Sequence, residues 1–151
     1  MNKLCVFSAL LLLAGCSSSP ATQQEKSLFQ LMAQATNAYN EARLDRAETL
    51  YLQVLQRNPN YSEANFKLGN IYSRQGRLDA AVLKYQQALT VDANDGRFWH
   101  NLALARVKQA IATLEGAEQH ITADSPYFPH LLQLQLQLNK LSGSRHEDAQ
   151  D

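Results

Sequence analysis

Residues 62–95 read SEANFKLGNIYSRQGRLDAAVLKYQQALTVDAND, and this stretch decides the fold. Small residues stand at Gly69, Ala81 and Ala88, where they allow two helices to approach each other closely. Gly76 and its polar neighbours are typical of a helix end, so a first helix stops there and a second follows. Large apolar side chains fill the space between the two helices, namely Leu68, Tyr72, Tyr85 and Leu89.

The preceding 34 residues repeat this pattern. Within residues 28–61, Ala47, Tyr51 and Leu55 each recur 34 positions later as the same residue type. The segment RLDRA at residues 43–47 likewise matches RLDAA at residues 77–81. One such unit cannot bury its own apolar face, so the sequence predicts that neighbouring units stack.

The period of 34 residues and the order of small and large side chains resemble the tetratricopeptide repeat (TPR) family. The resemblance is strong in residues 62–95 and weaker in residues 28–61, where Ala38 stands in place of a tyrosine. It implies an all-α superhelix of helical hairpins, with about two and a half repeats across residues 27–141. In this family the first helix of each unit lines a concave groove that binds other proteins.

A third, degenerate unit covers residues 96–123. Trp99 and Leu102 occupy positions expected of a first TPR helix. The residues typical of a second helix, around Leu114, then arrive about five positions early, because the inter-helix turn is missing. Two alternatives remain, a hairpin with an unusually tight turn or one long helix over residues 97–120. Helix-forming residues dominate this segment, which favours the long helix.

The C-terminal part begins with a helix breaker, DSPYFP at residues 124–129. Leucine and glutamine then alternate over residues 132–138, which is a strand pattern, although Leu131, Leu134 and Leu138 also have helical spacing. Leu and Gln are good helix formers, so we expect a capping helix over residues 129–141 and keep the strand as the alternative. The apolar surplus of this helix offers a surface for dimerisation. Residues 142–151 are polar and predict a disordered tail.

The N-terminal segment has the features of an export signal. A short apolar run, with Lys3 as the only charge in the segment, ends in LAGC at residues 13–16. This ending resembles the lipobox of bacterial lipoproteins, and the run is too short to span a bilayer. The resemblance implies that residues 1–15 are a signal peptide and that Cys16 carries a diacylglycerol and an acylated amine. The alternative is an ordinary secretory signal with a free cysteine at position 16.

The residues after Cys16 predict where the chain is held. Position 17 is Ser17 and not the aspartate that tends to retain Gram-negative lipoproteins at the inner membrane. The sequence therefore predicts an anchor in the outer membrane, with the protein facing the periplasm. Residues 17–26 are polar, contain Pro20 and lack periodic apolar residues, so residues 16–26 predict a lipidated flexible tether.

Composition and motifs argue against catalysis and against several other classes of protein. The formal net charge of +0 argues against a protein that coats nucleic acid or binds membranes through a polybasic patch. The 2 cysteines cannot make a disulfide scaffold or a four-thiolate zinc site. The 4 histidines lack metal-ligand spacing, and no phosphate-binding glycine loop or nucleophile motif occurs. We therefore expect no enzyme activity, no metal and no cofactor apart from the lipid on Cys16.

The candidate binding residues are the positions that line the concave groove in the TPR family, carried over to this sequence. They mix aromatic, amide and charged side chains, which suits an extended peptide or a partner helix. The alternative is that Phe29, Met32 and Phe66 pack on the tether or on one another. A few of the polar residues resemble part of the carboxylate clamp of chaperone-binding TPR proteins, but the full set is absent. The candidates are Phe29, Met32, Thr36, Tyr39, Asn40, Glu63, Phe66, Asn70, Ser73, Arg74, Arg97, His100, Leu104, Val107 and Lys108.

A lipobox followed by TPR units resembles the pilotin-like lipoproteins of type IV and tight-adherence (Flp) pilus systems. The resemblance implies a non-enzymatic outer-membrane adaptor that binds a secretin or another pilus-assembly subunit and helps to assemble or stabilise the complex. One alternative is an adaptor that regulates peptidoglycan enzymes, and a remote alternative is a hydrolase. The sequence also leaves room for a homo-oligomer, and it indicates no nucleic-acid binding.

Overall fold

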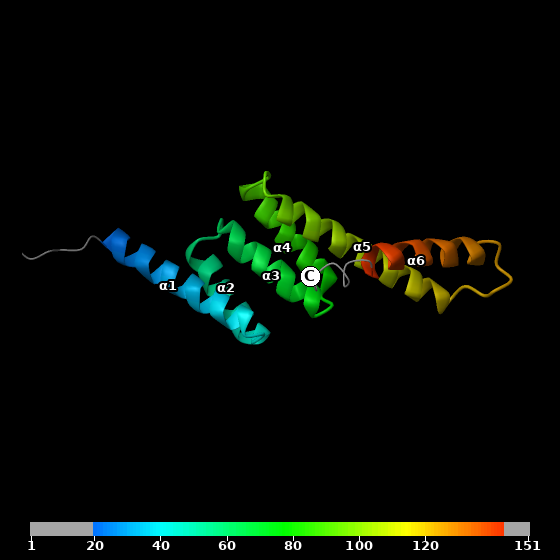
Figure 1. Cartoon of the computed structure of the whole chain (residues 1–151), viewed down its shortest axis with the longest axis horizontal. Coiled ribbons are helices and arrows are strands. Elements are labelled where there is room, and N and C mark those ends of the chain that lie inside the picture. The colour runs from blue at the N-terminus through cyan, green and yellow to red at the C-terminus, as the bar shows by residue number, and fades with distance from the viewer. Residues whose placement is uncertain (1–19, 144–151) are drawn as a thin grey trace, which may run out of the picture.

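A computed structural model describes residues 20–143, and six helices without any strand occupy that range. They are α1 (Pro20–Asn40), α2 (Leu44–Arg57), α3 (Ser62–Arg74), α4 (Leu78–Val91), α5 (Gly96–Glu118) and α6 (Phe128–Gly143). Figure 1 shows an elongated molecule in which successive antiparallel hairpins lie side by side. The prediction of an all-α stack of TPR-type hairpins is therefore confirmed.

The two ends of the described range differ from the sequence predictions. Helix α1 begins at Pro20, so the prediction of a flexible tether is wrong for residues 20–26. Proline is favoured in the first helical turn, and the Ala, Gln, Glu and Lys residues that follow are helix formers. Helix α6 extends to Gly143 and so includes the start of the predicted tail. The predicted signal peptide, the lipidation site Cys16 and residues 144–151 lie outside the described residues.

The two complete hairpins are equivalent down to individual hydrogen bonds. In the first, the Tyr51 hydroxyl on α2 donates to Thr36 Oγ1 on α1 at 3.4 Å. In the second, the Tyr85 hydroxyl on α4 donates to Asn70 Oδ1 on α3 at 2.9 Å. Tyr85 and Asn70 follow Tyr51 and Thr36 by 34 positions, so the period seen in the sequence is also the period of the internal contacts.

The core runs through both hairpins because small and large residues alternate along it. Ala35, Ala47, Ala81 and Ala88 are fully buried and leave room for their larger neighbours. Helix α3 contacts α2, α4 and α5, so it lies at the centre of the packing. The largest fully buried side chains are Tyr51, Tyr85, Phe98, Leu68, Ile71 and Val54.

The third unit consists of one long helix and a returning helix. Helix α5 runs without a break, and Asp95 caps its start because the Asp95 carboxylate accepts from Arg97 N at 2.9 Å. Helix α6 runs back antiparallel along the C-terminal half of α5 (Figure 1). Residues 131–138, for which a strand was the alternative, are helical. Within the described range, no helix is both long enough and apolar enough to cross a membrane.

The turn inside each complete hairpin contains one residue in the left-handed region. In the second hairpin this residue is Gly76, with a φ of 73°, and in the first it is Ala42, with a φ of 56°. For a residue with a Cβ atom this conformation costs about 1–2 kcal/mol of conformational energy, because the Cβ crowds the backbone. The turn of the first hairpin is therefore strained where that of the second is not.

We expect Ala42→Gly to raise the free energy of unfolding by about 0.5–1 kcal/mol, because relief of the left-handed strain outweighs the greater chain entropy of glycine. The reciprocal change, Gly76→Ala, should lower it by about 1 kcal/mol. Urea unfolding followed by circular dichroism measures both changes. A destabilised Ala42→Gly variant would contradict a left-handed residue at this turn.

Candidate functional site

A cavity of about 230 Å³ opens where α1, α3, α4 and α5 meet. The first helices of the three units supply most of its wall, as expected of the concave groove. Four of the residues predicted from the sequence line it, and two residues that were not predicted complete it. The lining residues are Tyr39, Asn70, Ser73, Arg74, Tyr85 and Asn101.

Asn70 joins three helices at the base of this cavity. Its Oδ1 accepts hydrogen bonds from the Tyr85 hydroxyl at 2.9 Å and from Asn101 Nδ2 at 2.7 Å. Both lone pairs of that oxygen are therefore occupied. None of the described residues accepts from Asn70 Nδ2, so the amide group remains a donor at the cavity.

The Tyr85 hydroxyl is held in its neutral form. Burial raises the pKa of Tyr85 to about 12, and the nearby Tyr39 adds to the rise. Hydrogen bonds to Ser73 and Asn101 act in the opposite direction without cancelling it. At neutral pH the hydroxyl therefore keeps its proton and donates to Asn70, and it does not serve as a general base.

Arg74 brings a positive charge to the rim of the cavity. Its guanidinium Cζ lies 5.0 Å from the centroid of the Tyr39 ring, and Lys67 Nζ lies 5.0 Å from the same centroid. Such cation–π contacts orient both side chains over the aromatic ring. No carboxylate of the described residues forms an ion pair with Arg74. Arg74 therefore offers its donors and charge to an incoming group.

Arg97, by contrast, already has acidic partners. Its Nη2 lies 2.6 Å from Asp95 Oδ2 and 3.0 Å from Glu63 Oε2, so it links the start of α5 to α3. The hydrogen bond from Arg97 lowers the pKa of Asp95, and the same bond raises the pKa of Arg97. This network organises the groove wall, and it leaves Arg74 as the cation without a carboxylate partner at the cavity.

The other predicted groove residues lie outside the cavity. Phe66 is buried, with its ring centroid 5.0 Å from that of Phe98, so it belongs to the core. Thr36 Oγ1 accepts a hydrogen bond from the Tyr51 hydroxyl inside the first hairpin. Phe29 on α1 is 75% exposed, so most of its side chain is not covered by neighbouring residues. The remaining residues are either exposed, as Asn40, His100 and Lys108 are, or half-buried, as Met32, Leu104 and Val107 are.

Two residues that line the cavity, Asn101 and Tyr85, are absent from the sequence-based candidates, although the sequence contains a sign of each. Asn101 stands four positions after Arg97 and three before Leu104, so it shares their stripe on α5. Tyr85 was assigned to the core, where its ring lies, but its hydroxyl reaches the groove. That reach follows from the length of a tyrosine side chain, whose polar end often emerges from an apolar site.

Comparison with known proteins supports the assignment of the helical hairpins to the tetratricopeptide repeat type. Residues 32–98, from α1 to the start of α5, match the family model described as "Tetratricopeptide repeat". The match and the stacked hairpins together support a TPR protein, and repeats of this kind indicate an interaction scaffold, which is typically not an enzyme. Within the described range, no group of three or more His, Cys, Asp or Glu side chains could hold a metal ion.

Two similar proteins illustrate how far the likeness extends. Protein O-mannosyl-transferase TMTC3 of Homo sapiens is 30% identical over 69 residues, which make up 46% of this chain and 8% of that protein. The transcription factor tau 131 kDa subunit of Saccharomyces cerevisiae is 34% identical over 87 residues, which make up 54% of this chain and 8% of that protein. The chain thus spans only a small part of either relative, and the activities in their names belong to those proteins.

Proposed function

We propose that this protein is a non-enzymatic adaptor that binds an extended segment of another protein in its concave groove. The proposal places it at the outer membrane, facing the periplasm, with a lipid on Cys16 as its anchor. Its partner in this proposal is a secretin or another subunit of a pilus-assembly complex. The support is the lipobox-like ending at residues 13–16 together with the TPR segment that follows.

The observation that carries the binding proposal is the set of hydrogen-bond donors around one cavity. Asn70 Nδ2 has no acceptor among the described residues and lies in the cavity that Ser73 and Asn101 also line, with Arg74 at its rim. The carbonyl groups of an extended peptide are acceptors that fit such donors. An acidic side chain or a terminal carboxylate of the peptide would pair with Arg74 and gain a charge-assisted hydrogen bond.

We expect Arg74→Glu to weaken partner capture by about tenfold or more, because it replaces the attractive charge with a repulsive one. The measurement is a cross-linked pull-down of the tagged full-length chain from solubilised membranes, quantified by mass spectrometry. Arg46→Glu is the matched control, since Arg46 is exposed on α2 and does not line the cavity. Circular dichroism should show equal helicity for both variants.

The identity of the captured protein separates the two candidate functions. A secretin or pilus-assembly subunit lost in Arg74→Glu and kept in Arg46→Glu supports the proposal. A peptidoglycan enzyme with the same behaviour would support the cell-wall adaptor in its place. Equal capture by both variants would contradict binding at the cavity.

A further inference from the structure

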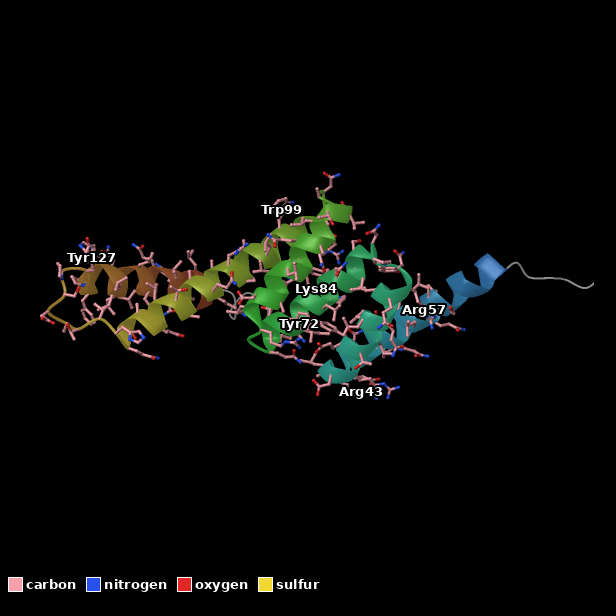
Figure 2. All side chains as sticks on the ribbon, turned by 180° about the vertical axis from the view of Figure 1, so that it is seen from behind. Arg43, Arg57, Tyr72, Lys84, Trp99 and Tyr127 are labelled. Atoms are coloured by element: carbon pink, nitrogen blue, oxygen red, sulfur yellow. The ribbon has the colours of Figure 1, made fainter. Side chains whose placement is uncertain are left out.

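The C-terminal hairpin forms an arm that projects beyond the stacked hairpins (Figure 1). We define the arm as residues 106–141, which comprise the C-terminal half of α5, the connection and α6. Its base, up to Thr113 on α5, lies against the start of α4, where Gln109 Nε2 donates to Asp79 Oδ1. Its tip, the connection, projects beyond the stack (Figure 1). Tyr127, which is 69% exposed, lies at the tip (Figure 2).

Helix α6 carries more apolar surface than α5 covers. Phe128, Leu131 and Leu138 share one face and are half-buried, which is the face toward α5. Leu132 and Leu136 lie on a flank of that face, and they are 44% and 63% exposed. Leu134 and Leu141, which are 45% and 60% exposed, lie on the opposite flank, so exposure alone does not choose between the two flanks.

The side of the arm that bears Leu132 and Leu136 carries charges of both signs on α5. Lys108 and Glu115 are seven residues apart on α5, so they lie about two helical turns apart on one face. Both are exposed, and neither forms an ion pair with another described residue. Successive residues of an α-helix are rotated by about 100° about its axis. With α5 and α6 packed antiparallel, this rotation places the face of Lys108 and Glu115 on the same side of the arm as Leu132 and Leu136.

These four residues form a self-complementary pattern along the arm. Lys108 lies toward the base and Glu115 toward the tip, because α5 ends at the tip. Helix α6 begins near the tip and runs back along α5. The midpoint between Leu132 and Leu136 therefore lies about as far from the tip as the midpoint between Lys108 and Glu115. A two-fold axis at that level would bring each lysine to the partner's glutamate and each leucine pair to its copy.

We propose that two copies of this chain pair through their arms, antiparallel, to form a four-helix bundle. The flank defined by Leu132 and Leu136 becomes the buried seam, and Lys108 and Glu115 form two symmetric ion pairs where α5 of one copy lies beside α5 of the other. A different partner would have no reason to match the arm's own order of charges. An isologous dimer does so by symmetry, and antiparallel four-helix packing is a common way to bury such faces.

The apolar part of the proposal is tested by sedimentation of the purified full chain in density-matched detergent over a range of concentrations. We expect a dimer for the unchanged chain and a dissociation constant about tenfold or more higher for Leu136→Glu. Leu83→Glu is the matched control, because Leu83 is 53% exposed on α4, outside the arm, and should leave the dimer intact. A chain that stays monomeric throughout would overturn the proposal and assign the face to another protein or to lipid.

The charge pattern gives a second test that depends on antiparallel pairing. Lys108→Glu and Glu115→Lys should each weaken self-association, since each places like charges together. An equal mixture of the two variants should associate as well as the unchanged chain, because every contact in the mixed dimer again joins a lysine to a glutamate. A mixture that associates no better than either variant alone would overturn the antiparallel dimer.

Discussion

The chain with Gly69→Arg is expected to lose its cooperative fold, and Gly69→Ala is expected to lower the free energy of unfolding by about 1–3 kcal/mol. A Cβ atom at position 69 would lie 2.4 Å from Tyr85 Cε1 and 2.6 Å from Tyr85 Cδ1. The ring has little room to withdraw, because Tyr85 is buried and its hydroxyl is bonded to Asn70. An arginine would have to displace the ring and the groove wall behind it.

Thermal and urea unfolding of Gly69→Ala measure this effect, and Gly116→Ala is its matched control. Gly116 is also helical, but a Cβ there meets no atom within 4 Å. The control should therefore gain stability, by about 0.5–1 kcal/mol, from the better helix propensity of alanine. Equal gains at the two positions would contradict the close approach of α3 and α4.

Phe98→Ala is expected to cost about 3–5 kcal/mol of unfolding free energy, the range for a large aromatic side chain removed from a packed core. Phe98 is 1% exposed, and its ring centroid lies 5.0 Å from that of Phe66. This contact joins the long helix α5 to the second hairpin. Its loss should free α5 and α6 from the stack as well as lower overall stability.

The neighbouring aromatic residue provides the control. Trp99 is larger than Phe98 but is 55% exposed near the start of α5 (Figure 2), and its Nε1 donates to Ala93 O at 2.9 Å. Trp99→Ala should cost about 1 kcal/mol, mainly through that hydrogen bond. Hydrogen exchange along α5 and α6 should rise in Phe98→Ala only. Equal costs at the two positions would mean that α5 packs by a different face.

Much of the fold could be predicted from the sequence, because the repeat imposes the same contacts twice. The match of Tyr51 with Tyr85 predicts two equivalent hairpins, and the hydrogen bonds of these tyrosines confirm it. The repeat pattern does not predict what packs against the last unit, because no further unit follows it in the repeat. Trp99 occupies a typical TPR position and makes the equivalent of the Asn65 bond to Pro59 O, but it remains half-exposed.

The two elements that the sequence left open depend on local propensity. The inter-helix turn is missing from the third unit, so α5 continues through the position where a hairpin would turn. The leucine and glutamine residues of α6 form a helix because neither residue is β-branched. The polarity of residues 20–26 predicts a tether, but these residues are also helix formers and extend α1 to Pro20.

The groove was partly predictable for the same reason as the fold. Tyr39, Asn70, Ser73 and Arg74 lie on the stripes that the repeat assigns to the concave face, and they line one cavity. The period does not predict how side chains pair with one another. It therefore missed that Phe66 turns into the core and that Arg97 is held by Asp95 and Glu63.

Site-specific photo-cross-linking in living cells tests the central claim, binding of a protein partner in the concave groove, most directly. A benzophenone amino acid placed at position 39, inside the cavity, should cross-link to a cell-envelope protein, and Arg74→Glu should abolish that product. The same probe at position 83, on the exposed surface of α4, should give no such product. A product from position 83 but not from position 39, or one from position 39 that survives Arg74→Glu, would contradict groove binding.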